Sequence, residues 1–128
     1  IARLRLFRSE TVGPITFYKL LSRYGSAVKA LEALPYLAKR GGKNTLNIMS
    51  IQQASDEMAA LEDINGYHVV FGDANYPEWL TTIDDAPPIL SVLGDVSFLS
   101  RPSIAIVGAR NASANAKRFT QSLATELA

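Results

Sequence analysis

The chain has 128 residues, of which 48% are hydrophobic and 20% are charged, and its formal net charge is +1. This composition supports a buried core and excludes a disordered tail. The absence of cysteine excludes a disulfide scaffold and thiolate metal sites, and a single histidine, His68, excludes a multi-histidine metal site.

The small net charge hides a strong segregation along the chain. Residues 1–43 carry nine Lys and Arg against Glu10 and Glu32, residues 44–100 carry nine Asp and Glu and no Lys or Arg, and residues 101–128 are basic again. Such blocks indicate separate surfaces, and a basic surface favours a polyanionic partner. A solvated helical face explains the first basic block equally well.

The N-terminal region predicts no secretion signal. Residues 1–8 interleave arginine with apolar residues, whereas a signal peptide needs an unbroken apolar stretch. No apolar run approaches the roughly 20 residues that a membrane-spanning helix needs. We therefore expect a cytoplasmic protein without membrane partners, and because the first residue is not methionine we expect that the true N-terminus is missing.

The first half of the chain is predicted to be helical. Residues 1–9 have the pattern of a helix end, and Pro14 suits the first position of the next helix. A buried stripe with helical spacing follows, formed by Phe17, Leu20, Leu21 and Tyr24. Gly25 can end this helix, and Ser26 can cap another that runs through Leu34 and is broken by Pro35.

A further helix is predicted to complete this half. Residues 50–53 have the Ser-x-x-Gln form of a capping box, and Asn65-Gly66 ends the helical pattern. Residues 1–64 are therefore expected to form one small all-helical domain.

The second half has the pattern of a mixed α/β region. Strands are predicted at residues 67–71, 89–93 and 103–107, with a short helix at residues 76–83. The last strand is a continuous apolar run that suits burial on both faces. Residues 108–115 then form a turn into a helix with Phe119, Leu123 and Leu127 on one side, which opens an α/β unit. We expect residues 65–128 to be the first part of a longer domain.

The turn after the third predicted strand is the sharpest candidate site. Gly108 would let a ligand approach the backbone, and the N–H groups at the start of the next helix favour an anion. Arg110 can hold a phosphate in a bidentate grip, and Ser113 can cap the helix or donate its hydroxyl. Neither the G-x-G-x-x-G fingerprint nor the P-loop is present, so a packing glycine and a surface arginine remain the alternative.

Other features favour structural roles. The Val12-Gly13-Pro14 hairpin could present backbone N–H groups to DNA, but a simple turn in a helical bundle fits slightly better. Trp79 could stack on a base but is expected in the core, and His68 is expected to be a satisfied core residue rather than a catalyst. The paired acids at residues 62–63 and 84–85 are expected to be solvated, with no metal site.

Taken in order, these strings resemble the DNA-processing protein A (DprA/Smf) family. The resemblance rests on Val12-Gly13-Pro14, on Tyr76-Pro77-Glu78-Trp79-Leu80, on Pro87-Pro88-Ile89-Leu90, and on the run from Ile104 through Val107-Gly108-Ala109-Arg110 to Ser113. Ala109 departs from the commoner serine of the motif, and Asn115-Ala116 stands where Tyr-Gly is frequent.

The resemblance implies a SAM-like, helix-hairpin-helix domain at residues 1–64, followed at 65–128 by the beginning of an extended Rossmann-like domain. It implies a non-enzymatic protein without cofactors that binds single-stranded DNA in natural transformation and recombination, protects incoming DNA, helps load the RecA recombinase, and forms a homodimer. Its DNA-phosphate site would consist of Gly108, Ala109, Arg110 and Ser113.

Two other functions stay open. A nucleotide-binding enzyme of a related fold, such as a nucleotide phosphoribohydrolase, would use the same turn but needs a catalytic acid or base that residues 101–128 do not offer convincingly. Alternatively, the helical half is an interaction module only.

Overall fold

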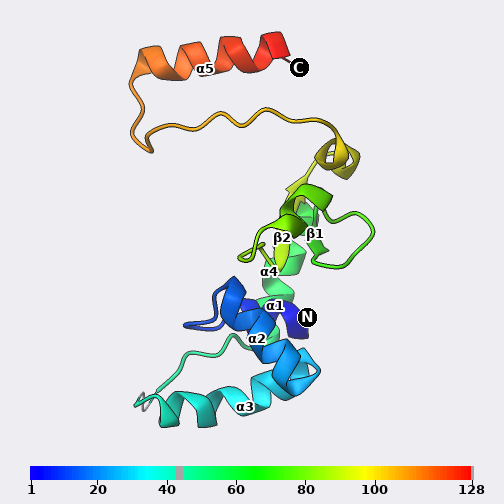
Figure 1. Ribbon diagram of the computed structural model, residues 1–128, viewed down its shortest axis with the longest axis vertical. Helices are drawn as coiled ribbons and strands as arrows, with labels where there is room; N and C mark the ends of the chain where they lie inside the picture. The colour runs from blue at the N-terminus through cyan, green and yellow to red at the C-terminus, as the bar shows by residue number, and fades with distance from the viewer. Residues whose placement is uncertain (43–44, 128) are drawn as a thin grey trace.

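The computed structural model describes residues 1–42 and 45–127. Four α-helices come first, and strands, short 3-10 helices (η) and a last α-helix follow (Figure 1). The helical half contains α1 (Ala2–Arg8), α2 (Pro14–Tyr24), α3 (Ala27–Arg40) and α4 (Ile51–Asp63). The second half contains β1 (Gly66–Val70), η1 (Glu78–Thr82), β2 (Ile89–Leu93), η2 (Val96–Ser100) and α5 (Ala114–Leu127).

The first three helices pack around one apolar cluster. Phe17 on α2 is 2% exposed and is surrounded by buried side chains of α1, α2 and α3, among them Leu6, Leu20, Ala30, Leu31 and Leu34. Burial of this stripe supplies the main driving force for the bundle, because apolar area removed from water contributes roughly 25 cal/mol per Å². The predicted stripe of α2 is confirmed, with Leu21 and Tyr24 at its half-buried margin.

The helix ends follow the local sequence signals. Pro14 stands in the first turn of α2, and Gly25 ends that helix in the left-handed region with φ of 76°. The side chain of Ser26 accepts a hydrogen bond from the Lys29 N–H at the start of α3. Ser50 and Gln53 form the predicted capping box of α4. These ends pair backbone groups that a helix leaves without intrahelical partners.

The prediction that Pro35 breaks the third helix is wrong. Pro35 lies inside α3, which continues to Arg40. A proline removes one backbone hydrogen bond and crowds the preceding turn. Leu34 is 5% exposed and Leu37 packs against the same cluster, so tertiary burial on both sides of the proline holds the helix together.

The sheet of the described residues has two antiparallel strands. β1 pairs with β2 in a register that places Gly66 opposite Leu93 and Val70 opposite Ile89. Both strands were predicted, and Val69 and Val92 are buried beneath Tyr76. The predicted helix at residues 76–83 is instead the short 3-10 helix η1.

The predicted third strand is absent from the described structure. Residues 103–107 run without regular structure and are exposed, with Val107 at 92% and Ile104 at 69%. A strand is stabilised by pairing with a neighbour, and in the described part of the chain β1 and β2 pair only with each other. Figure 1 shows this segment extending away from the sheet to α5, whose apolar residues Phe119 and Leu127 are exposed as well.

The two halves of the chain are packed together. Leu4 of α1, Ala54 of α4 and Ile89 of β2 form one buried cluster. Edge-to-face ring contacts continue from Tyr18 of α2 to Phe71, with centroids 5.1 Å apart, and from Phe71 to Tyr76. The helical half and the β1–β2 sheet therefore share a core, although their net charges differ in sign.

Candidate functional site

The turn from Gly108 to Ser113 is open to solvent in the structure. Gly108, Ala109, Arg110 and Ser113 are all exposed, and a turn at Arg110 and Asn111 redirects the chain into α5. Among the described residues, no ion pair holds the Arg110 guanidinium. The arginine is therefore available for an external anion.

Ser113 has the capping role that the sequence predicts. Its hydroxyl oxygen accepts a 3.2 Å hydrogen bond from the Ala116 N–H, and its carbonyl accepts one of 3.0 Å from Lys117. The N–H groups of Ala114 and Asn115 belong to the first turn, where a helix offers no intrahelical acceptor. The positive end of the dipole of this 14-residue helix adds to the attraction for an anion.

A shallow hollow of about 400 Å³ lies between the turn and the first turns of α5. Its lining includes Gly108, Ala109 and Lys117. Lys117 is a functional candidate that sequence reasoning missed, although its position one turn into the helix after the glycine turn could have indicated it. The hollow thus places one cation beside the exposed Gly108 and Ala109, and Arg110 lies outside its lining.

The structure removes one alternative for Gly108. A β-carbon at this position would meet no atom within 4 Å, and the residue is not in the left-handed region. Neither packing nor backbone conformation therefore requires a glycine here. What remains is a bare stretch of backbone that a ligand can approach closely.

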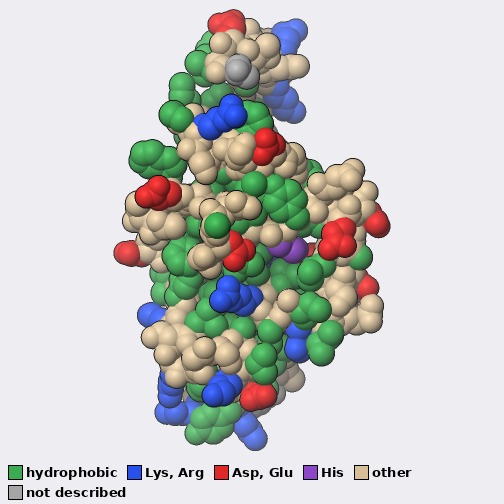
Figure 2. Space-filling model, turned by 90° about the vertical axis from the view of Figure 1, so that its right-hand side faces the viewer, with side chains coloured by type: hydrophobic (Ala, Val, Ile, Leu, Met, Phe, Trp, Pro, Cys, Tyr) green, Lys and Arg blue, Asp and Glu red, His purple; other side chains and the backbone are tan. Residues whose placement is uncertain are grey.

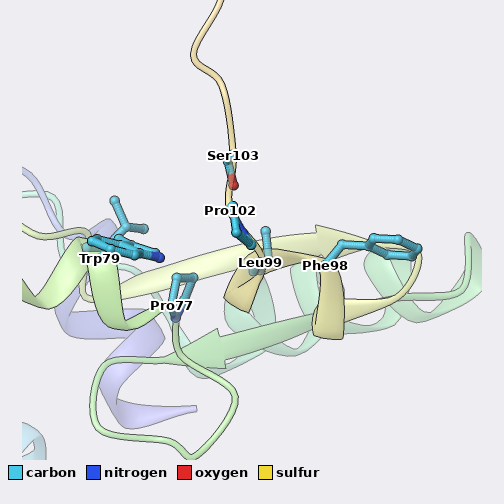
Figure 3. A pocket seen from close by; sticks show the side chains of 7 residues that line it. Pro77, Trp79, Phe98, Leu99, Pro102 and Ser103 are labelled. Atoms are coloured by element: carbon cyan, nitrogen blue, oxygen red, sulfur yellow. The ribbon is translucent and has the colours of Figure 1, made fainter. Parts of the chain in front are cut away.

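The expectation that Trp79 lies in the core is wrong. Its side chain is 71% exposed and borders an apolar pocket of about 600 Å³ that also includes Pro77, Leu80, Phe98 and Pro102. Figure 3 shows Trp79 beside Pro77, with Phe98 extending from η2 away from it. Trp79 belongs to η1, a 3-10 helix in place of the helix that the sequence predicts.

His68 is only partly satisfied. Its Nδ1 lies 3.3 Å from the Ser91 hydroxyl on the neighbouring strand, whereas its buried Nε2 has no hydrogen-bond partner among the described residues. Within those residues, no group of three His, Cys, Asp or Glu side chains could hold a metal ion.

The first basic block divides into structural and free cations. Arg8 forms an ion pair with Glu57 at 2.8 Å, and Arg5 donates to the Met49 carbonyl, so both join α1 to the α4 region. Lys43 lies outside the described residues. Exposed cations remain on α1, α2 and α3, at Arg3, Lys19, Arg23, Lys29, Lys39 and Arg40. Figure 2 shows Lys and Arg side chains gathered over the lower end of the molecule, where α2 and α3 lie in Figure 1.

The hairpin before α2 is built into the core on one side. Val12 is 6% exposed within the helical cluster, whereas Gly13 is exposed, and Thr11 has a positive φ of 67°.

Two family models together match nearly the entire chain. The model of the DprA-like N-terminal HHH domain matches residues 1–60, and that of DNA recombination-mediator protein A matches residues 67–128. The chain belongs to the DprA family.

Membership of the DprA family assigns this chain to DNA processing in recombination. It also agrees with a helical first half followed by a region of sheet and helix. A comparison with curated proteins finds no match. No helix in the described part of the chain is long and apolar enough to cross a membrane.

Proposed function

We propose that this DprA-family protein binds single-stranded DNA through the turn formed by Gly108, Ala109, Arg110 and Ser113. The observation that carries the proposal is the accessibility of this turn at the start of α5. The backbone at Gly108 is unobstructed, and Arg110 forms no ion pair with a described residue. Backbone N–H groups and a guanidinium are the usual donors for phosphate. Lys117, which lines a hollow together with Gly108 and Ala109, adds a second cation.

The surroundings of the turn favour binding over catalysis. In residues 101–127 the only carboxylate is Glu126, which lies near the far end of α5 and accepts a hydrogen bond from Ser122. A phosphoribohydrolase would need an acid or base close to the bound phosphate. We therefore infer a non-enzymatic role without a cofactor.

We infer the wider role from the family. The protein would act in the cytoplasm, protect single-stranded DNA that enters during natural transformation, and deliver it to the RecA recombinase. Residues 1–64 and 65–128 would act as two packed domains, the helical one SAM-like and the second the start of a Rossmann-like domain. The exposed apolar side of α5, with Phe119 at 69%, supports assembly into a homodimer.

Titration of a labelled oligothymidine at two or more salt concentrations tests the DNA site. We expect Arg110→Ala to weaken binding about tenfold or more, since a charge-assisted hydrogen bond contributes roughly 1.5–3 kcal/mol. The slope of log K against log salt should fall by about 0.7, the value for one phosphate contact on a single strand. Arg23→Ala is the matched control, because Arg23 is also exposed but stacks on Tyr24 far from the turn in sequence.

Unchanged affinity and salt slope in Arg110→Ala would remove this residue from the site. If the protein hydrolysed nucleoside monophosphates and left single-stranded DNA unbound, the enzymatic alternative would replace the proposal.

A further inference from the structure

The outward side of α3 carries a band of cations with one aromatic ring. The buried side of this helix is formed by Ala27, Ala30, Leu31 and Leu34. With 3.6 residues per turn, the opposite side presents Lys29, Tyr36, Lys39 and Arg40. All four are exposed and together form the outer α3 face.

Tyr36 and Arg40 are already arranged as a stacked pair. The ring of Tyr36 is 63% exposed, and the Arg40 guanidinium carbon lies 5.8 Å from its centroid. A tyrosine this exposed contributes little to the hydrophobic core of the helical half. A solvent-accessible aromatic ring beside an arginine is the kind of platform on which nucleic-acid bases stack without sequence preference.

The cations of this face are not neutralised by the protein. Lys29, Lys39 and Arg40 form no ion pair with any described residue, in contrast to Arg8, which is bound by Glu57. The nine acidic residues of positions 44–100 therefore do not compensate the positive charge of the outer α3 face through ion pairs. On the same side of the helix only Glu32 opposes the positive charge, one turn before Tyr36.

We propose that the outer α3 face is a second contact surface for single-stranded DNA, on which Tyr36 stacks against a base while Lys29, Lys39 and Arg40 contact neighbouring phosphates. The proposal rests on the proposed function and extends it to the helical half, which lies at the opposite end of the molecule from α5 in Figure 1. Charge complementarity and the exposed ring favour a nucleic acid over an acidic protein, which would not need the aromatic platform.

The experiment is an oligothymidine titration of the entire protein over a range of salt concentrations. A triple variant, Lys29→Gln, Lys39→Gln and Arg40→Gln, should lower the salt slope by about 2, because each lost phosphate contact removes about 0.7. Tyr36→Ala should weaken binding at least fivefold with little change in the salt slope, since stacking contributes roughly 1–3 kcal/mol per base. Glu32→Gln should change affinity in the opposite direction and tighten binding.

Arg23→Gln serves as the matched control, because it removes an exposed cation of α2 outside the face. Thermal unfolding should be nearly the same for all variants, since every substituted side chain is exposed.

If the α3 variants bind like the unmodified protein while Arg110→Ala binds more weakly, the second surface is overturned and the turn at Gly108 remains the DNA site. If the unmodified protein binds no single-stranded DNA, the proposed function itself fails. If the triple variant keeps its DNA affinity but loses binding to an acidic protein, the face is a protein contact and the proposal is wrong.

Discussion

The hydroxyl of Tyr18 in α2 donates a 3.0 Å hydrogen bond to the carbonyl of Ala86, which lies 68 positions later in the connection before β2. Ala86 is 1% exposed, so this carbonyl has little access to water. The hydrogen bond joins the helical half to the β1–β2 region at the same place where the Tyr18 ring packs on Phe71. The helical half therefore covers part of the second half, and deletion of residues 1–64 would expose that surface as well as remove cations.

Tyr18→Phe should lower the free energy of unfolding by about 1 kcal/mol, because the ring packing is retained and one partly buried hydrogen bond is lost. Urea denaturation followed by circular dichroism measures the change. Tyr36→Phe is the matched control, because the side chain of Tyr36 is exposed and its hydroxyl bonds to no described residue. Equal destabilisation by both substitutions would contradict a specific role for the Tyr18–Ala86 bond.

The protein should lose stability between about pH 10 and pH 12. Burial raises the pKa of Tyr18 to about 12, and the neighbouring Tyr76 adds to this rise. Because the folded state holds the Tyr18 proton more tightly than the unfolded state, its contribution is fully present below pH 10 and is lost as the pH rises through the folded value.

Denaturation midpoints measured at pH 8, 10 and 11.5 test this dependence. Tyr18→Phe should lose less stability over this range than the unmodified protein. Tyr76 retains part of the dependence in that variant, because burial raises its pKa too. If the two proteins had the same dependence of stability on pH, Tyr18 would be excluded as a cause of the loss at high pH.

Ser50→Ala should destabilise the protein by about 1 kcal/mol, because the Ser50 hydroxyl accepts the Gln53 N–H at 3.1 Å in the capping box of α4. The loss would appear as a lower thermal midpoint. Ser55→Ala, in the interior of the same helix, should be neutral or slightly stabilising, because alanine has the higher helix propensity. A smaller effect at Ser50 than at Ser55 would argue against the cap.

Gly108→Ala should leave the thermal midpoint unchanged, because a β-carbon there meets no atom within 4 Å. It should nevertheless weaken oligothymidine binding, since the methyl group would stand on the backbone that the phosphate is proposed to approach. Ala109→Ser, which adds a hydroxyl donor at the next position, should bind at least as tightly as the unmodified protein. Full affinity in Gly108→Ala would mean that DNA does not touch this backbone.

Local signals predicted the helix ends well. The signals at these ends act between atoms within four residues of each other, so a short stretch of sequence is enough to predict them. They are Pro14, Gly25, Ser26 and the Ser50–Gln53 pair. Spacing likewise identified Phe17 and Leu20 as core residues, because both lie on the single buried side of α2.

The errors concern features that depend on distant neighbours. Pro35 stays helical because Leu34 and Leu37 pack on other helices, and this packing is invisible in the local sequence. Residues 103–107 have strand composition but no strand beside them among the described residues. The turn at Gly108 could be predicted as an accessible backbone from its sequence, whereas Lys117 in its hollow became evident only in the structure.

The segment of residues 103–107 also affects how the protein should be handled. Ile104, Ile106 and Val107 are β-prone, uncharged and exposed, and their backbone has no neighbouring strand in the described structure. Such a run is a template for edge-to-edge association between molecules. Concentrated samples should therefore self-associate and precipitate, and replacing Val107 by lysine should raise the solubility limit.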